Sequence, residues 1–291
     1  MTTTEPFGVR LQAATAAYGP LCVGIDPHRS IVEEWGLTYD VAGLERFAMT
    51  CVEAFAGQVA IVKPQSAFFE VFGSRGIAVL ERTIAGFAGS GTLTLLDAKR
   101  GDIGSTMDAY AEALLGKDAV APADAVTVSP FLGYGSLRPA IDLAARTGRG
   151  VFVLALTSNP EGPSVQHAVH DDRTVARAIV EAVTADNADA TAAGHLGHVG
   201  MVVGATVGSA VQDLGLDLAA ANAPLLAPGF GAQGGTADDL RRVFADAWPH
   251  VLPSSSRGVL AAGPDVLALR AAVARATESL WPRSDPGQRS D

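Results

Sequence analysis

The sequence has 291 residues, of which 48% are hydrophobic and 18% are charged. This composition supplies enough apolar side chains for a large core and excludes a disordered, low-complexity chain. The net charge of −10 at pH 7 disfavours nucleic acid or an anionic membrane as a partner, because both are negatively charged.

Short apolar segments rich in β-branched residues alternate along the chain with longer segments of helical apolar spacing. The short segments are almost continuously apolar, which is typical of parallel strands covered on both faces. In chain order we predict strand 21–25, helix 41–55, strand 59–62, helix 67–87, strand 93–96, helix 103–115, strand 125–128, helix 137–145, strand 151–156, helix 175–190, strand 199–203, helix 209–214, strand 225–227, helix 237–248, strand 251–252 and helix 264–281.

The repeat length of these elements favours a closed barrel. Eight strand and helix pairs occupy residues 21–281, roughly 33 residues per pair, which fits a (β/α)8 barrel better than an open doubly wound sheet. No interdomain linker interrupts the series. We therefore predict an α/β fold, a single (β/α)8 TIM barrel domain over residues 1–282, followed by a polar tail, residues 283–291, that we expect to be disordered.

The cysteines and the N-terminal residues bear on location. Cys22 and Cys51 form no Cys-x-x-Cys motif and are too few for a disulfide framework, as is typical of a reducing compartment. The N-terminal residues lack the basic and apolar parts of a signal peptide, and no run of about 18 apolar residues could span a bilayer. We expect a cytoplasmic protein without a membrane span.

Polar residues follow several of the predicted strands, where a (β/α)8 barrel places its active site. Because residues two apart in an extended strand end point to the same side, Asp97 and Lys99 should face the barrel mouth together. An ordinary ion pair is the alternative interpretation of these two residues alone. With Asp26 and Lys63 on adjacent strands, they predict an alternating array of carboxylates and ammoniums. Such an array keeps a lysine protonated, and an unpaired carboxylate in it would raise the energy of a substrate carboxylate bound beside it.

A glycine-rich segment follows the strand at 225–227. It contains Gly229-x-Gly231-x-x-Gly234, the spacing of a dinucleotide site, but no acidic residue ends the next strand to bind a ribose. The backbone N–H groups of residues 231–235, a helix starting at Thr236 and Arg257 after the last strand instead predict a phosphate site at its usual place in barrels. A flexible turn without a ligand is the alternative.

The segments at the strand ends resemble orotidine 5'-monophosphate (OMP) decarboxylase, specifically the longer bacterial branch of that family. The matching motifs, which occur in this order over nearly the whole chain, are Gly24-Ile25-Asp26-Pro27, Val62-Lys63-Pro64-Gln65, Asp97-Ala98-Lys99-Arg100-Gly101-Asp102-Ile103, Ser158-Asn159-Pro160, residues 227–235 and Ser256-Arg257-Gly258. The resemblance implies a homodimeric (β/α)8 barrel that converts OMP to uridine 5'-monophosphate (UMP) and carbon dioxide in de novo pyrimidine biosynthesis, without a metal or cofactor.

The resemblance also implies a role for each matched residue. Asp97 would lie against the departing carboxylate, Lys99 would protonate C6 after carbon dioxide leaves, and Lys63 would link the ribose to the charge array. The implied substrate-binding residues are Asp26 at the ribose hydroxyls, Ser158 at the pyrimidine edge, Pro228 and Gly234 in the phosphate segment, Gln233 and Arg257 at the phosphate itself, and Ile103 and Thr106 in the partner's site. Asp102, which the resemblance makes catalytic together with Asp97, Lys99 and Lys63, would also enter the partner's site. One departure is Ser256, where many members have glycine.

Two other functions stay open at this point. Relatives of the family use Asp-x-Lys-x-x-Asp on the same barrel for metal-assisted chemistry on sugar phosphates, as in ketogulonate-phosphate decarboxylases and hexulose-phosphate synthases. A nonenzymatic protein that binds a nucleotide phosphate is the second alternative. The lysines at 63 and 99 argue against mere binding, because burying so much charge is costly, and activity that survives a chelator would argue against the metal enzymes.

Overall fold

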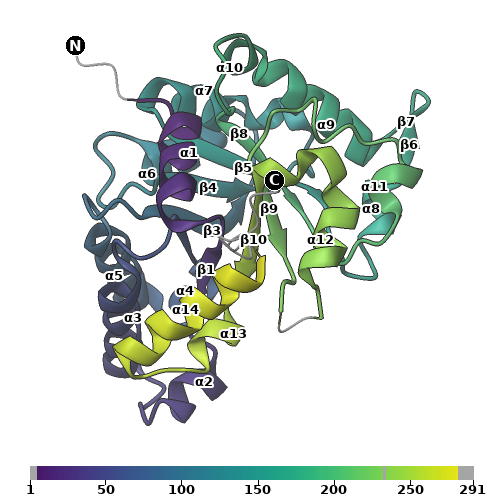
Figure 1. Cartoon of the computed structure of the whole chain (residues 1–291). Coiled ribbons are helices and arrows are strands. Elements are labelled where there is room, and N and C mark those ends of the chain that lie inside the picture. The colour runs from purple at the N-terminus through teal and green to yellow at the C-terminus, as the bar shows by residue number, and fades with distance from the viewer. Residues whose placement is uncertain (1–4, 232–233, 281–291) are drawn as a thin grey trace, which may run out of the picture.

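The computed structural model describes residues 5–231 and 234–280, and its centre is a closed barrel of parallel strands (Figure 1). Around the barrel the order is β1, β2, β3, β4, β5, β8, β9 and β10, with β10 pairing back to β1. Their bounds are β1 Cys22–Ile25, β2 Ile61–Pro64, β3 Leu93–Arg100, β4 Ala125–Val128, β5 Gly150–Leu156, β8 Val199–Val203, β9 Leu225–Pro228 and β10 Val251–Ser255. The predicted (β/α)8 fold is confirmed.

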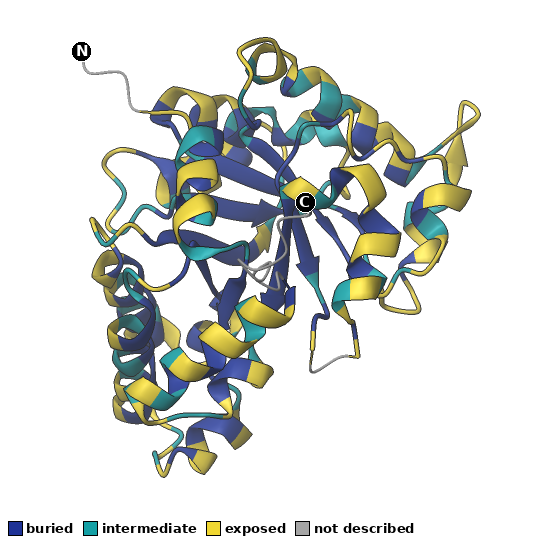
Figure 2. Ribbon diagram, viewed as in Figure 1, coloured by how far each residue is buried: buried dark blue, intermediate teal, exposed yellow. Residues whose placement is uncertain are grey.

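Helices surround the barrel and turn their buried sides toward it (Figure 2). They are α1 Phe7–Tyr18, α2 Arg29–Glu34, α3 Val41–Phe55, α4 Ser66–Glu70, α5 Gly73–Gly86, α6 Gly104–Leu115, α7 Arg138–Thr147, α8 Pro163–Gln166, α9 Val175–Asp186, α10 Ala188–Ala192, α11 Ala210–Asp213, α12 Ala237–Phe244, α13 Arg257–Leu260 and α14 Val266–Leu280, with 3-10 turns η1 Tyr134–Leu137 and η2 Ala245–His250. A short hairpin, β6 Val169–His170 and β7 Arg173–Thr174, lies outside the barrel. No helix in residues 5–231 and 234–280 has the length and apolar character needed to cross a bilayer.

Each barrel strand is buried on both of its faces, as its apolar sequence predicts. Neighbouring residues of a strand pack into different clusters: Ile61 belongs to the cluster inside the barrel, and Val62 belongs to the cluster between barrel and helices. Helix α1, which we did not predict, adds Phe7 to the inner cluster, where its ring meets that of Phe152 edge to face at 6.1 Å. This helix therefore closes the amino-terminal end of the barrel.

Several predicted helices are interrupted in the structure. Residues 67–87 form two helices, α4 and α5, because Gly73 has a φ of +61°, outside the right-handed helical region. Residues 175–190 divide at Asn187, whose buried amide donates to the carbonyls of Val199 and Ala221. The last strand is longer than residues 251–252, because it continues through Pro253 and Ser254 to Ser255. The tail, residues 283–291, lies outside the described residues, and the single-domain organisation stays a prediction.

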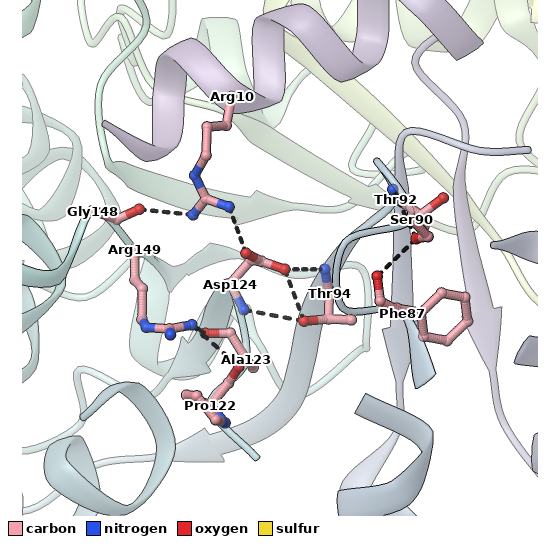
Figure 3. A network of polar contacts seen from close by, with 10 residues as sticks. All are labelled: Arg10, Phe87, Ser90, Thr92, Thr94, Pro122, Ala123, Asp124, Gly148 and Arg149. Atoms are coloured by element: carbon pink, nitrogen blue, oxygen red, sulfur yellow. Dashed lines mark hydrogen bonds and ion pairs between the residues drawn. The ribbon is translucent and has the colours of Figure 1, made fainter. Parts of the chain in front are cut away.

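A polar network ties α1 to the strands beneath it (Figure 3). The guanidinium of Arg10 donates to Asp124 Oδ1 at 2.6 Å and to the carbonyl of Gly148 at 2.7 Å. The other carboxylate oxygen of Asp124 accepts from the backbone N–H of Thr94 at 2.9 Å and from its hydroxyl at 3.0 Å. One carboxylate thus connects the N-terminal helix, β3 and the start of β4.

We expect Asp124→Ala to destabilise the fold. The substitution removes the acceptor of the Arg10 guanidinium and of the Thr94 amide in a partly buried place, so the free energy of unfolding should fall by about 2 kcal/mol in urea titrations. Glu33→Ala is the control, because it removes an exposed pair with Arg29 and should cost less than about 0.5 kcal/mol. Equal losses in the two variants would contradict this role of Asp124.

Candidate active site

A polar cavity of about 530 Å³ opens at the carboxyl ends of the barrel strands. Side chains from successive strands line it, which is the arrangement expected where parallel strands end at one rim. Among its lining residues are Asp26, His28, Lys63, Gln65, Asp97, Lys99, Ser158, Gln166, Pro228, Gly229, Ser254, Ser256 and Arg257. A cavity of about 710 Å³ lies at the other end of the barrel, but its Arg10 and Asp124 already serve the network that holds α1. The cavity at the carboxyl ends, which gathers charged side chains from several strands, is therefore the candidate active site.

The carboxylate of Asp97 is the centre of the polar cluster in this cavity. Its Oδ2 accepts from Lys63 Nζ at 2.8 Å and from the Gln65 amide at 2.9 Å. Its Oδ1 accepts from Lys99 Nζ at 2.6 Å and from the hydroxyl of Thr127 at 2.8 Å. Two ammoniums and two neutral donors from three neighbouring strand ends therefore fix both oxygens of one carboxylate.

Opposite charges set the protonation states of Lys63 and Asp97, each of which is only 6% exposed. Burial by itself lowers the pKa of Lys63, but the carboxylates of Asp26 and Asp97 outweigh it and hold this pKa above its usual value. Burial by itself raises the pKa of Asp97, but the ammoniums of Lys63 and Lys99 outweigh it and hold this pKa well below its usual range. At neutral pH, Asp97 is therefore an anion and Lys63 a cation.

Strand β3 is not regular where it carries the acid and the lysine. Its register against β4 shifts between Leu96 and Arg100, and the three intervening residues stand opposite one β4 residue, Thr127. Lys99 has a φ of +47°, so the alternation of an extended strand does not explain its direction. The prediction that Asp97 and Lys99 face the cavity together is confirmed, but its physical reason was wrong: a bulge re-aims the lysine.

The structure places the other predicted residues in two groups. Asp26, Ser158, Pro228 and Arg257 line the same cavity as the charge array. The cavity is not lined by Asp102, Ile103 or Thr106. The Asp102 carboxylate accepts a hydrogen bond from the backbone N–H of Ile103 at 2.8 Å. Ile103 is 62% exposed, and Thr106 is exposed on α6.

The predicted phosphate segment is only partly described, because Gln233 lies outside the described residues. The backbone N–H groups of Gly231, Gly234 and Gly235 donate to carbonyls of the same loop. Gly234 is not among the lining residues of the cavity. The amide cradle that we predicted is therefore not formed by these three residues, and Arg257 is the predicted phosphate ligand that the structure places at the cavity.

Sequence reasoning gave no role to two residues that bond to Asp97. Gln65 follows Lys63 by two residues at the end of the Val62-Lys63-Pro64-Gln65 motif. That spacing was the only sequence feature that could have indicated a role for Gln65 at the site. Thr127 is a polar residue in the middle of an apolar strand and is only 1% exposed. A buried hydroxyl in a barrel strand next to the active site was the signal that could have singled it out.

Comparisons with known proteins show the family to which this chain belongs. The profile described as Orotidine 5'-phosphate decarboxylase / HUMPS family matches residues 19–272. The chain belongs to this family. An orotidine 5'-phosphate decarboxylase of Streptomyces coelicolor is 60% identical over 273 residues, which is 93% of this chain and 95% of the relative. One from Corynebacterium efficiens is 49% identical over 284 residues, which is 97% of this chain and 100% of the relative.

Solved structures of family members have the same fold. The crystal structure of a proposed orotidine 5'-phosphate decarboxylase from Streptomyces avermitilis has a TM-score of 0.91 at 57% identity, and the match covers 96% of each chain. A structure of a Leishmania donovani OMP decarboxylase has a TM-score of 0.72 at 31% identity, and the match covers 94% of this chain and 97% of that one. Members thus share the fold over almost the full length of this chain.

Proposed function

We propose that this chain decarboxylates OMP to UMP and carbon dioxide, with Lys99 as the proton donor. The observation that carries the proposal is the buried Asp97 carboxylate held between the ammoniums of Lys63 and Lys99 in a cavity of about 530 Å³. Curated relatives at 60% identity carry the name of this activity. The reaction places the enzyme in UMP biosynthesis as a carboxy-lyase.

In the proposed reaction, Asp97 acts on the carboxylate that leaves. It stays ionised beside the substrate carboxylate at C6, because the two lysines hold its pKa well below the usual range. Repulsion between the two carboxylates raises the energy of the bound substrate, and loss of carbon dioxide relieves it. The charges are fixed before the reaction, so little reorganisation is needed as it proceeds.

Lys99 then completes the reaction. The bond from C6 to the carboxyl carbon breaks and its electron pair stays on C6, where the nearby ammonium stabilises the developing charge. Lys99 Nζ donates its proton to C6 to form UMP, and because its side chain is 45% exposed it can regain a proton from water. Lys63 remains a cation throughout, and its Nζ lies 2.8 Å from Asp97 and 3.9 Å from Asp26.

The remaining cavity residues hold the nucleotide in this proposal. The Asp26 carboxylate lines the cavity and its side chain is 16% exposed, so it can accept a hydrogen bond from a ribose hydroxyl. Ser158, just after the end of β5, contacts the edge of the pyrimidine. Arg257, just after β10, binds the phosphate together with Gln233. Pro228, which lines the cavity, and Gly234, which does not, belong to the segment around that phosphate.

Arg257→Ala should weaken nucleotide binding. The guanidinium supplies a charge-assisted hydrogen bond to the phosphate, so the Kd for UMP, measured by calorimetry, should rise roughly 10- to 100-fold. Turnover should fall as well, because phosphate binding also holds the base in place. Arg275→Ala, on the exposed face of α14, is the control. An unchanged Kd for UMP in Arg257→Ala would mean that the phosphate binds elsewhere.

The activity itself can be tested with purified protein, OMP and EDTA, by following the loss of the orotate absorbance and the formation of UMP. We expect turnover that does not depend on a metal or cofactor. Among the described residues, no group of three or more His, Cys, Asp or Glu side chains is placed to hold a metal ion. Loss of activity on chelation, with an essential metal found by elemental analysis, would favour the sugar-phosphate enzymes of the same family. UMP binding without turnover would favour the nonenzymatic alternative.

The active site is shared between two subunits in this proposal. Asp102, Ile103 and Thr106 lie outside their own cavity, and the exposed Ile103 is one of three large apolar side chains in the loops after β3 and β4, with Phe131 at 78% and Leu132 at 52% exposure. Large apolar side chains that are exposed in one protomer are covered when an interface forms over them. We infer a homodimer in which Asp102 and Thr106 enter the partner's site and Ile103 lines it. A cytoplasmic location also stays a prediction, based on the two cysteines.

A further inference from the structure

Thr127 is the one residue of β4 that lies opposite the irregular part of β3. The register of the two strands places Asp97, Ala98 and Lys99 against this one residue. A bulge removes backbone groups from the regular ladder of hydrogen bonds, so the amides of these residues need other acceptors. The side chain of Thr127 supplies one of them.

One hydroxyl of Thr127 connects the two reacting groups. Its Oγ1 accepts from the backbone N–H of Lys99 at 2.9 Å and donates to Asp97 Oδ1 at 2.8 Å. A hydroxyl has a single proton, and an ionised carboxylate can only accept. The direction of both hydrogen bonds is therefore determined, and the backbone of the lysine is coupled to the carboxylate through one oxygen atom.

This coupling acts on a backbone that needs support. Lys99 has a φ of +47°, in the left-handed region that is unfavourable for residues other than glycine. Only the surrounding contacts can keep a residue there, and the hydrogen bond from its N–H to Thr127 is one of them. The same hydroxyl limits rotation of the Asp97 carboxylate, whose Oδ1 also accepts from Lys99 Nζ.

We propose that Thr127 is a positioning residue, which holds the bulge of β3 in the shape that aims Lys99 and Asp97 at C6 of the substrate. Thr127 is not among the residues that line the cavity, so it acts through these two groups and does not bind the nucleotide. The inference rests on the proposed decarboxylation. It adds to that function a residue on the neighbouring strand that sets its geometry.

The test compares two substitutions at this position with one elsewhere. Thr127→Val keeps the shape of the side chain and removes the hydroxyl, whereas Thr127→Ser keeps the hydroxyl. Thr83→Val is the matched control, since Thr83 is also a buried threonine, and its hydroxyl bonds to Val79 within α5. For each variant, kcat and KM for OMP, the Kd for UMP and the thermal unfolding midpoint are measured.

A positioning role predicts that the effect falls on turnover. A misplacement of reacting groups by about 1 Å costs on the order of 100-fold, so kcat of Thr127→Val should fall by about that factor while the Kd for UMP changes less than about threefold. Thr127→Ser should recover kcat to within about fivefold of the parent. Thr83→Val should leave kcat unchanged and affect only the unfolding midpoint.

Two results would overturn the inference. One is a Thr127→Val enzyme that is less stable but turns over within about threefold of the parent, as a purely structural hydroxyl predicts. The other is a serine variant as slow as the valine variant, because then the methyl group and not the hydroxyl matters. Should Thr127→Val fail to fold, Thr127→Ala removes the same hydroxyl and is judged by the same criterion. Turnover by the parent and by Thr83→Val tests the decarboxylase activity separately.

Discussion

Lys99→Ala should abolish turnover and leave nucleotide binding almost intact. The proposed proton donor acts at the reacting carbon, after the substrate has bound, so its removal affects the transition state far more than the ground state. General acid catalysis contributes up to about 10⁴-fold, and a loss of this order in kcat is expected. The Kd for UMP should change much less, because the phosphate and ribose contacts remain.

The chain offers a matched control for this substitution. Its three lysines are Lys63, Lys99 and Lys117, and Lys117 is exposed and does not line the cavity. Lys117→Ala should therefore keep full activity. Comparable loss of UMP binding and of turnover in Lys99→Ala would show that this lysine holds the nucleotide, and the proton donor would have to be sought elsewhere.

Activity should reappear when two inactive variants share a dimer. We expect Lys99→Ala and Asp102→Ala each to be nearly inactive. In a mixed dimer, one site combines Lys99 from the Asp102→Ala chain with Asp102 from the Lys99→Ala chain, and the other site lacks both. Random assembly from equal amounts makes half of the dimers mixed, so about a quarter of all sites should be intact. Mixed dimers are isolated after coexpression by two different affinity tags, and in that isolated sample half of the sites should be intact.

A second pair of variants separates a shared site from any general effect of mixing. Lys63 and Lys99 bond to the same Asp97 carboxylate within one chain, so no mixed dimer of Lys63→Ala and Lys99→Ala contains an intact site. This pair should stay inactive. If isolated dimers of Lys99→Ala with Asp102→Ala are as inactive as the parents, Asp102 serves its own subunit and the shared-site proposal is wrong.

The sequence alone determined the order of the barrel and most of the polar residues at its mouth. Short apolar runs separated by helical patterns predict parallel strands, because short and almost continuously apolar segments are typical of strands that are buried on both faces. Closing such strands into a barrel brings all their carboxyl ends to one rim. Asp26, Lys63, Asp97 and Arg257, which follow different strands, could therefore be assigned to one site without knowledge of any distance.

Only the tertiary structure decided how the reacting groups are aimed. The bulge in β3 and the left-handed backbone of Lys99 depend on the register against β4, and apolar periodicity does not specify a local register shift. The hydrogen bond between Thr127 and Asp97 joins residues 30 positions apart in the chain. The closure of the barrel by α1 through Phe7 and Arg10 likewise depends on contacts with β5 and the start of β4. Such contacts form between side chains that are distant in sequence, so a pattern read along the chain could not predict them.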